Sequence, residues 1–152
     1  ADRKQNKLMS LKLSGIDGEL NAHTKALFAN YQNIQDNETL SEAYMCDDAD
    51  IVLTGYGTCA RVCKKAVKML REQGIKAGLF RPVTLWPFPQ KELEAACAHA
   101  KKILTVEMSM GQMVQDVKLY SGHKPSDVEF YGEPGGIIPS VDVIIEKVKS
   151  YV

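Results

Sequence analysis

Short apolar runs alternate with amphipathic segments along most of the chain, and this alternation predicts its elements. Residues 51–54 form an apolar run that leads directly into Gly55-Tyr56-Gly57, a pattern typical of a buried parallel strand that meets a tight turn. The next segment carries an apolar stripe at helical spacing, made of Val62, Cys63, Ala66, Val67 and Leu70. We expect Thr58 to cap that helix and Gly74 to end it.

The same alternation continues to the end of the chain. The further expected strands are residues 75–80, 103–106 and 128–131. The further expected helices are residues 90–100, residues 112–120 and a last helix that starts at Ser140. Strands without a polar alternate face, joined to helices by short connections, predict a mainly parallel sheet covered on both sides. The fold class is therefore α/β, with three layers in the order α/β/α.

The first part of the chain is more polar. Residues 1–19 begin with a lysine-rich stretch and lack sustained periodicity, so we interpret them as a linker remnant from a preceding domain and expect the chain to be a fragment. An apolar patch at residues 8–13 leaves open an extra edge strand. Apolar positions at three- and four-residue spacing predict a helical lead-in over residues 20–45. We expect residues 20–152 to form a single α/β domain.

Charge and composition exclude several classes of protein. Nineteen basic and nineteen acidic side chains cancel, which removes the bulk attraction that drives most nucleic-acid binding. No apolar run approaches the roughly 18 residues of a spanning helix, so we expect no membrane contact. Four cysteines are too sparse for a disulfide scaffold and favour a reducing, cytoplasmic setting.

The turn after the first strand is a candidate anion site. Residues 55–60 match the pattern G-x-G-x-x-A between a strand and a helix, where main-chain amides bind phosphate in other proteins. The candidate residues are Gly55, Gly57 and Thr58, with Arg81 as a further anion partner. No acidic residue ends the second strand, which argues against a dinucleotide site. A purely structural turn, an anion contact and a nucleotide site remain alternatives.

We predict no catalytic set and no metal site in this chain. Cys59 lies in the first turn of a predicted helix, where its pKa would be lowered and its thiol more reactive than that of Cys63. We favour the other interpretation, in which the cysteines are buried or half-buried small thiols. Glu107 follows a strand directly, where a carboxylate either acts in catalysis or binds neighbouring loop amides. The histidines lack metal-ligand spacing.

Large apolar side chains in and after two loops suggest a subunit interface. The candidate residues are Trp86, Phe88, Met108 and Met110. The alternative is that they cover this domain's own core.

Several short motifs together resemble a known family. They are Tyr56-Gly57-Thr58 with Ala60-Arg61, Gly78-Leu79-Phe80-Arg81-Pro82, Thr84-Leu85-Trp86-Pro87-Phe88-Pro89 and Val106-Glu107-Met108-Ser109-Met110-Gly111-Gln112-Met113. Over about residues 20–152 the chain resembles the C-terminal domain of alpha subunits of 2-oxoacid:ferredoxin oxidoreductases, particularly the 2-ketoisovalerate and 2-oxoglutarate types.

The resemblance implies a fold like the transketolase C-terminal domain and a complex that oxidatively decarboxylates a 2-oxoacid to an acyl-CoA while reducing ferredoxin. Thiamine diphosphate, magnesium, iron–sulfur clusters and CoA are implied for the whole complex. None is expected to bind this domain, because the resemblance places the diphosphate-binding and cluster-binding segments in other domains or subunits. The chain agrees: it has no clustered-cysteine motif, and Gly15-Ile16-Asp17-Gly18 does not match the magnesium motif. The implied partners are the other domain of the alpha subunit and the thiamine-binding subunit, with ferredoxin reached through the complex.

Three hypotheses follow from the sequence. The first is an assembly domain of an oxidoreductase, inactive on its own. The second is a module that binds CoA, NAD(P) or another anion through residues 55–60. The third, suggested only by Asp47, Asp48 and Asp50, is a phosphoacceptor domain, although these aspartates precede the first strand instead of following it.

Overall fold

The computed structural model describes residues 18–151, and the chain divides into two units, residues 1–37 and residues 38–152. In the first unit the described element is helix α1 (Glu19–Asn37), on which no residue is buried. The interpretation of residues 1–19 as a linker remnant falls almost wholly outside the described residues, as does the edge strand considered at residues 8–13. The single domain over residues 20–152 stays a prediction.

The predicted lead-in helix over residues 20–45 is wrong in its last part, because Ser41–Tyr44 form strand β1. This strand pairs antiparallel with β3 (Ala77–Pro82), with Glu42 opposite Arg81. The pairing continues beyond the strand, where the amides of Val83 and Thr84 donate to the carbonyl oxygen of Leu40 at 2.9 and 3.1 Å. These main-chain partners lie some forty residues away, so a local pattern could not reveal them.

The second unit is built on a five-stranded sheet with the order β1-β3-β2-β4-β5. The remaining strands are β2 (Ile51–Thr54), β4 (Lys102–Glu107) and β5 (Val128–Gly132). All pairs other than β1 with β3 are parallel, which confirms the predicted mainly parallel sheet. Strand β3 starts at Ala77, later than predicted, because residues 73–75 still bond to the end of the preceding helix.

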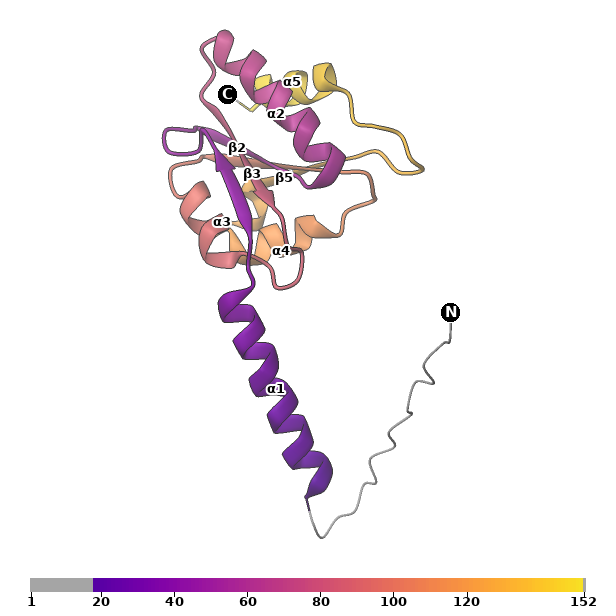
Figure 1. Cartoon of the computed structure of the whole chain (residues 1–152). Helices are drawn as coiled ribbons and strands as arrows, with labels where there is room; N and C mark the ends of the chain where they lie inside the picture. The colour runs from indigo at the N-terminus through magenta and orange to yellow at the C-terminus, as the bar shows by residue number, and fades with distance from the viewer. Residues whose placement is uncertain (1–17, 152) are drawn as a thin grey trace, which may run out of the picture. The chain divides into compact units, whose positions relative to one another are not determined.

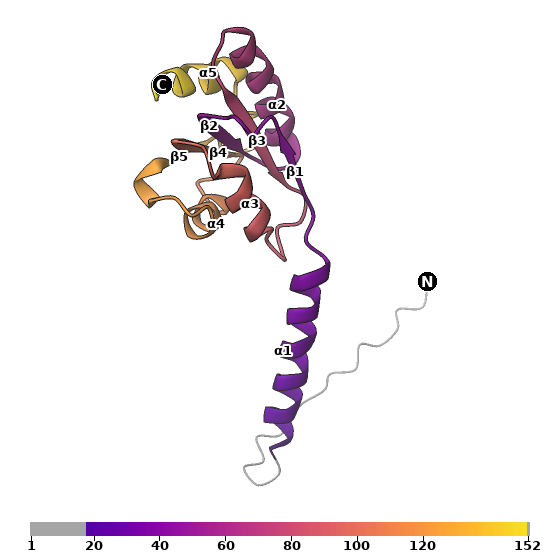
Figure 2. The same ribbon diagram turned by 90° about the vertical axis from the view of Figure 1, so that its left-hand side faces the viewer.

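Helices cover both faces of the sheet (Figures 1 and 2). One face carries α2 (Gly57–Glu72) and α5 (Val141–Lys149), and the other carries α3 (Gln90–Cys97) and α4 (Met113–Tyr120). A short 3-10 helix, η1 (Pro125–Asp127), precedes β5. The predicted α/β/α layering is therefore confirmed.

The strands bury both of their faces, so the domain has two cores. Alternate residues divide between them: Ile51 and Leu53 pack with α2 and α5, whereas Val52 packs with α3 and α4. Two buried hydroxyls bond to each other, with Thr54 Oγ1 donating to Thr105 Oγ1 at 2.9 Å. Each of these two buried hydroxyls, on β2 and β4, therefore has a hydrogen-bond partner.

Helix α2 begins two residues earlier than a cap at Thr58 would allow. Its N-cap residue is Tyr56, no side chain caps it, and Thr58 lies exposed within the first turn. The prediction for Thr58 was therefore wrong. Gly74 ends the helix as predicted, with a φ of +82° that favours glycine, and its amide donates to the carbonyl oxygen of Arg71.

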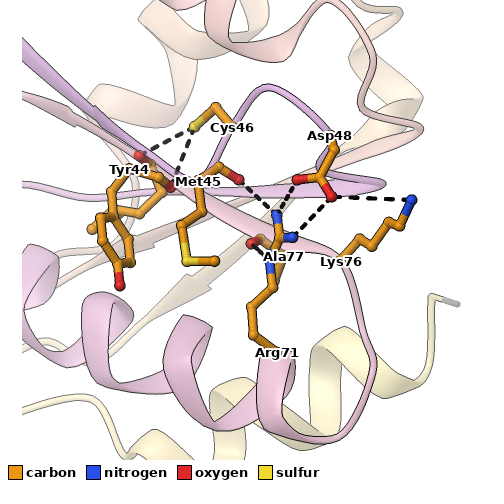
Figure 3. A network of polar contacts seen from close by, with 8 residues as sticks. Tyr44, Met45, Cys46, Asp48, Arg71, Lys76 and Ala77 are labelled. Atoms are coloured by element: carbon orange, nitrogen blue, oxygen red, sulfur yellow. Dashed lines mark hydrogen bonds and ion pairs between the residues drawn. The ribbon is translucent and has the colours of Figure 1, made fainter.

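Arg71, in the last turn of α2, connects three segments of the chain (Figure 3). Its Nε donates to the carbonyl oxygen of Ala77 at 2.7 Å, and one terminal nitrogen donates to that of Met45 at 2.8 Å. Both terminal nitrogens bond to the carboxylate of Asp48, at 3.0 and 2.7 Å. The guanidinium therefore fixes the turn between β1 and β2 against the start of β3.

The same turn packs closely against Gly78 in β3. A Cβ atom there would lie 2.7 Å from the carbonyl oxygen of Met45 and 3.1 Å from the Cβ of Ala49. Only glycine permits this approach of backbone to backbone.

Because Asp48 belongs to this turn at the amino end of β2, the phosphoacceptor hypothesis loses its support.

Replacing Arg71 with alanine should lower the free energy of unfolding by about 2 kcal/mol, because two main-chain carbonyls lose a charged donor. Urea denaturation of the full chain measures the change. The matched control is Lys68→Ala on the exposed side of the same helix, for which we expect a change within about 0.5 kcal/mol. Equal stability of the two variants would contradict the role given to Arg71.

Candidate functional site

A pocket with a volume of about 420 Å³ lies beside the first half of α2. It is lined by residues of β1, β3 and α2: Glu42, Gly57, Thr58, Ala60, Arg61, Lys64, Leu79 and Arg81. Strand alternation explains the contribution of β3, because Leu79 and Arg81 point to the face that α2 covers. Helical spacing explains that of α2, where Gly57, Arg61 and Lys64 are four and three residues apart.

The pocket brings together three of the four predicted anion-site residues. Gly57, Thr58 and Arg81 line it, whereas Gly55 does not. A Cβ atom at Gly55 would lie 3.3 Å from the carbonyl oxygen of Val106 and 3.4 Å from the amide nitrogen of Ala60. Gly55 therefore serves close packing of the turn against β4 and α2.

Cationic side chains dominate the pocket. Glu42 accepts a hydrogen bond from Lys64 Nζ at 2.8 Å and one from the Nη1 of Arg81 at 3.1 Å. These two bonds hold the pKa of the Glu42 carboxyl below its ordinary value, and the bond from Lys64 has the larger effect. Arg61 forms no ion pair with any residue between 18 and 151. Three cations thus face one carboxylate.

One hydrogen-bond donor of the pocket residues is unsatisfied. The Nε atom of Arg81 is buried and has no acceptor among the described residues. Buried donors in folded proteins nearly always have a partner, so this atom marks a place where one is missing.

Sequence reasoning missed Glu42, Arg61 and Lys64. Glu42 was placed in a helix, and only the pairing of β1 with β3 brings it opposite Arg81. Arg61 and Lys64 did carry a signal, since both lie on one side of the helix that starts at Gly57.

Glu107, at the end of β4, is fully buried and holds the loop that follows it. Its carboxylate accepts hydrogen bonds from the hydroxyl of Ser109 at 3.0 Å and from the amides of Gln112, Met113 and Val114, at 2.9 to 3.3 Å. The three amides belong to the N-terminus of α4, where the N-cap residue provides no side-chain cap. The carboxylate thus binds loop amides, the non-catalytic alternative.

The cysteines are buried, the interpretation that the sequence favoured, and the lowered pKa considered for Cys59 was wrong. Burial raises the pKa of the Cys59 thiol, and the nearby charge of Glu107 raises it further. Burial likewise raises the pKa of Cys63, and that of Cys97 to about 12. Desolvation at the first turn of α2 thus outweighs the field of the helix N-terminus.

The predicted interface residues differ in exposure. Phe88 is buried and stacks on Tyr120 with 5.8 Å between ring centroids, so it belongs to this domain's own core. Trp86, which precedes a cis peptide bond to Pro87, is 57% exposed. Met110 is 79% exposed and Met108 is 36% exposed. The interface hypothesis therefore keeps Trp86, Met108 and Met110.

No helix within residues 18–151 is both long and apolar enough to cross a bilayer. No group of three or more histidine, cysteine, aspartate or glutamate side chains within the same residues is placed to hold a metal ion.

The fold and site define an α/β domain of the transketolase-like kind, with its loops gathered at the carboxyl ends of parallel strands. Residues 49–144 match the family model of pyruvate:ferredoxin oxidoreductase core domain II. This match spans more than half of the chain, and the chain therefore belongs to that family. The domain is one found in 2-oxoacid:ferredoxin oxidoreductase subunits, as the sequence motifs predicted.

Two relatives from Methanothermobacter marburgensis support this assignment. Ketoisovalerate oxidoreductase subunit VorB is 41% identical over 119 residues, which cover 78% of this chain and 33% of the relative. 2-Oxoglutarate synthase subunit KorA is 39% identical over 102 residues, which cover 67% of this chain and 27% of the relative. The chain thus spans about a third or less of the length of these relatives.

Solved structures share the fold. A 2-oxoglutarate:ferredoxin oxidoreductase from Magnetococcus marinus matches 88% of this chain and 23% of its own, with a TM-score of 0.76 and 23% identity. A split-gene transketolase matches 73% of this chain and 40% of its own, with a TM-score of 0.58 and 16% identity. These likenesses confirm the predicted transketolase-like architecture.

Replacing Glu107 with glutamine should lower the free energy of unfolding by about 1–3 kcal/mol, because an amide NH₂ group would face main-chain donors. Thermal or urea unfolding of the full chain measures the loss. Glu146→Gln, on an exposed position of α5, is the matched control and should stay within about 0.5 kcal/mol of the parent. An unchanged midpoint for Glu107→Gln would disprove the capping role.

All four cysteines should resist a thiol reagent in the folded chain, because each is buried. We expect an aromatic disulfide reagent near neutral pH to label them only as fast as the domain opens, and all at once in denaturant. Rapid labelling of Cys59 in the folded chain would contradict its inertness, and Cys59→Ser identifies which thiol reacts.

Proposed function

We propose that this chain is the C-terminal domain of the alpha subunit of a 2-oxoacid:ferredoxin oxidoreductase that acts on a branched-chain 2-oxoacid such as 2-ketoisovalerate. The observation that carries the proposal is 41% identity with a ketoisovalerate oxidoreductase subunit over 78% of the chain. The whole enzyme would oxidatively decarboxylate the 2-oxoacid to an acyl-CoA and pass electrons to ferredoxin. The isolated chain would have no activity.

The cofactors of such an enzyme would lie outside this domain. The pocket beside α2 is lined by three cationic side chains and one carboxylate, which does not fit a magnesium ion. The four thiols are buried in two separate cores, which does not fit an iron–sulfur cluster. Magnesium and the clusters are therefore assigned to other parts of the complex. We propose the same for thiamine diphosphate and CoA, and this domain would support their assembly.

Exposed apolar side chains support the assembly role. Val83, Leu85 and Trp86 lie in the β3–α3 loop with 48%, 46% and 57% exposure, and we call them the apolar loop surface. Tryptophan and methionine are enriched at protein interfaces, and Met108 and Met110 lie in the β4–α4 loop. The partners would be the other domain of the alpha subunit and the thiamine-binding subunit, with ferredoxin reached through the complex.

A pull-down of the purified chain against the remainder of the alpha subunit together with the thiamine-binding subunit tests the proposal. We expect the chain to be retained, and Trp86→Ala to weaken retention tenfold or more, about 1.4 kcal/mol or greater, as for an aromatic interface residue. Leu119→Ala is the matched control, since Leu119 is 70% exposed but lies on α4, outside both loops.

Two outcomes would contradict the assembly role. One is retention of neither form of the chain. The other is an enzyme of equal activity and stability assembled from the remaining parts without this domain. Equal loss for Trp86→Ala and Leu119→Ala would remove the apolar loop surface from the interface.

A further inference from the structure

We propose that the pocket beside α2 is a binding site for the phosphate group of a small molecule. In the absence of ligand, the carboxylate of Glu42 pairs with the cationic side chains that would bind the phosphate, and the ligand displaces it. This site is independent of the proposed function, because it is defined by residues of this chain alone. Four features support it: charge, an unsatisfied donor, the helix end and the size of the pocket.

Charge favours a dianion. Arg61, Lys64 and Arg81 all line the pocket, and only Glu42 opposes them. The two ion pairs of Glu42 are about 40% exposed at each side chain, so water competes with them. A monocarboxylate would gain little by replacing Glu42, whereas a phosphate carries more charge and more acceptor oxygens.

The guanidinium of Arg81 has one donor without an acceptor. Its Nη1 bonds to Glu42, while its Nε is buried without any acceptor in the described part of the chain. A guanidinium presents a fork of donors that matches two oxygens of one phosphate. A phosphate that displaced Glu42 from Nη1 could offer a second oxygen to Nε.

The N-terminus of α2 adds main-chain donors at the same place. Gly57 and Thr58 line the pocket and form the first turn of this 16-residue helix, which no side chain caps. A Cβ atom at Gly57 would meet nothing within 4 Å, so the approach to the turn is open. Uncapped amides at a helix start favour an anion.

Size indicates a small molecule as the ligand. A volume of about 420 Å³ falls within the roughly 300–1,000 Å³ typical of small-molecule sites. It exceeds what a single phosphate ion would fill, so a diphosphate or a nucleotide phosphate with part of its ribose would fit.

Isothermal titration of the full chain with inorganic pyrophosphate, inorganic phosphate and adenosine diphosphate tests the site. We expect saturable pyrophosphate binding that Arg81→Gln weakens about tenfold or more. Glu42→Gln should instead strengthen it severalfold, because the internal competitor is removed. Lys68→Gln changes the same charge on α2 outside the pocket and should alter affinity less than twofold.

The three ligands distinguish the source of the phosphate. Adenosine diphosphate binding more tightly than pyrophosphate would identify a nucleotide site, and the reverse would identify a free diphosphate site. Arg81→Lys is a second variant of the same position that retains the positive charge. The unfolding midpoint of each variant shows whether a loss of binding is a loss of folding.

Three results would overturn the proposal. They are no saturable binding of any probe at about 10 mM, equal weakening by Lys68→Gln and Arg81→Gln, and weaker binding by the folded Glu42→Gln variant.

Discussion

The contacts of Arg71 hold the sheet edge on which the candidate site depends. One guanidinium bonds to the carbonyl oxygens of Met45 and Ala77 and to the carboxylate of Asp48. Three segments that are separate in sequence therefore meet at the end of α2 (Figure 3). Because the turn between β1 and β2 is fixed there, β1 is aligned with β3, and Glu42 comes to lie opposite Arg81.

The pocket is a product of this topology more than of any single motif. Ligands of open α/β sheets usually lie beyond the carboxyl ends of parallel strands. Here the antiparallel strand β1 extends the sheet past α2, and the exposed margin carries charged side chains from β1, β3 and α2. The glycine-rich turn contributes Gly57 to the pocket, while Gly55 is needed for packing.

The sequence predicted what depends on local periodicity: the parallel strands, the helices between them and the three layers. It could not predict what depends on distant partners. Strand β1 needs the edge of β3, and the raised pKa of Cys59 needs burial and the neighbouring Glu107. Three of the four anion-site residues do meet in the pocket, yet Glu42 could not be added before the pairing was known.

The strand order leaves β1 and β5 at the two edges of the sheet in the described part of the chain. Each edge strand carries a glutamate as its second residue, Glu42 in β1 and Glu129 in β5. A charge at such a position disfavours the addition of a further strand from another molecule, and so protects against aggregation. Neighbouring proteins should therefore meet this domain through its loops and helices, and not by extending its sheet.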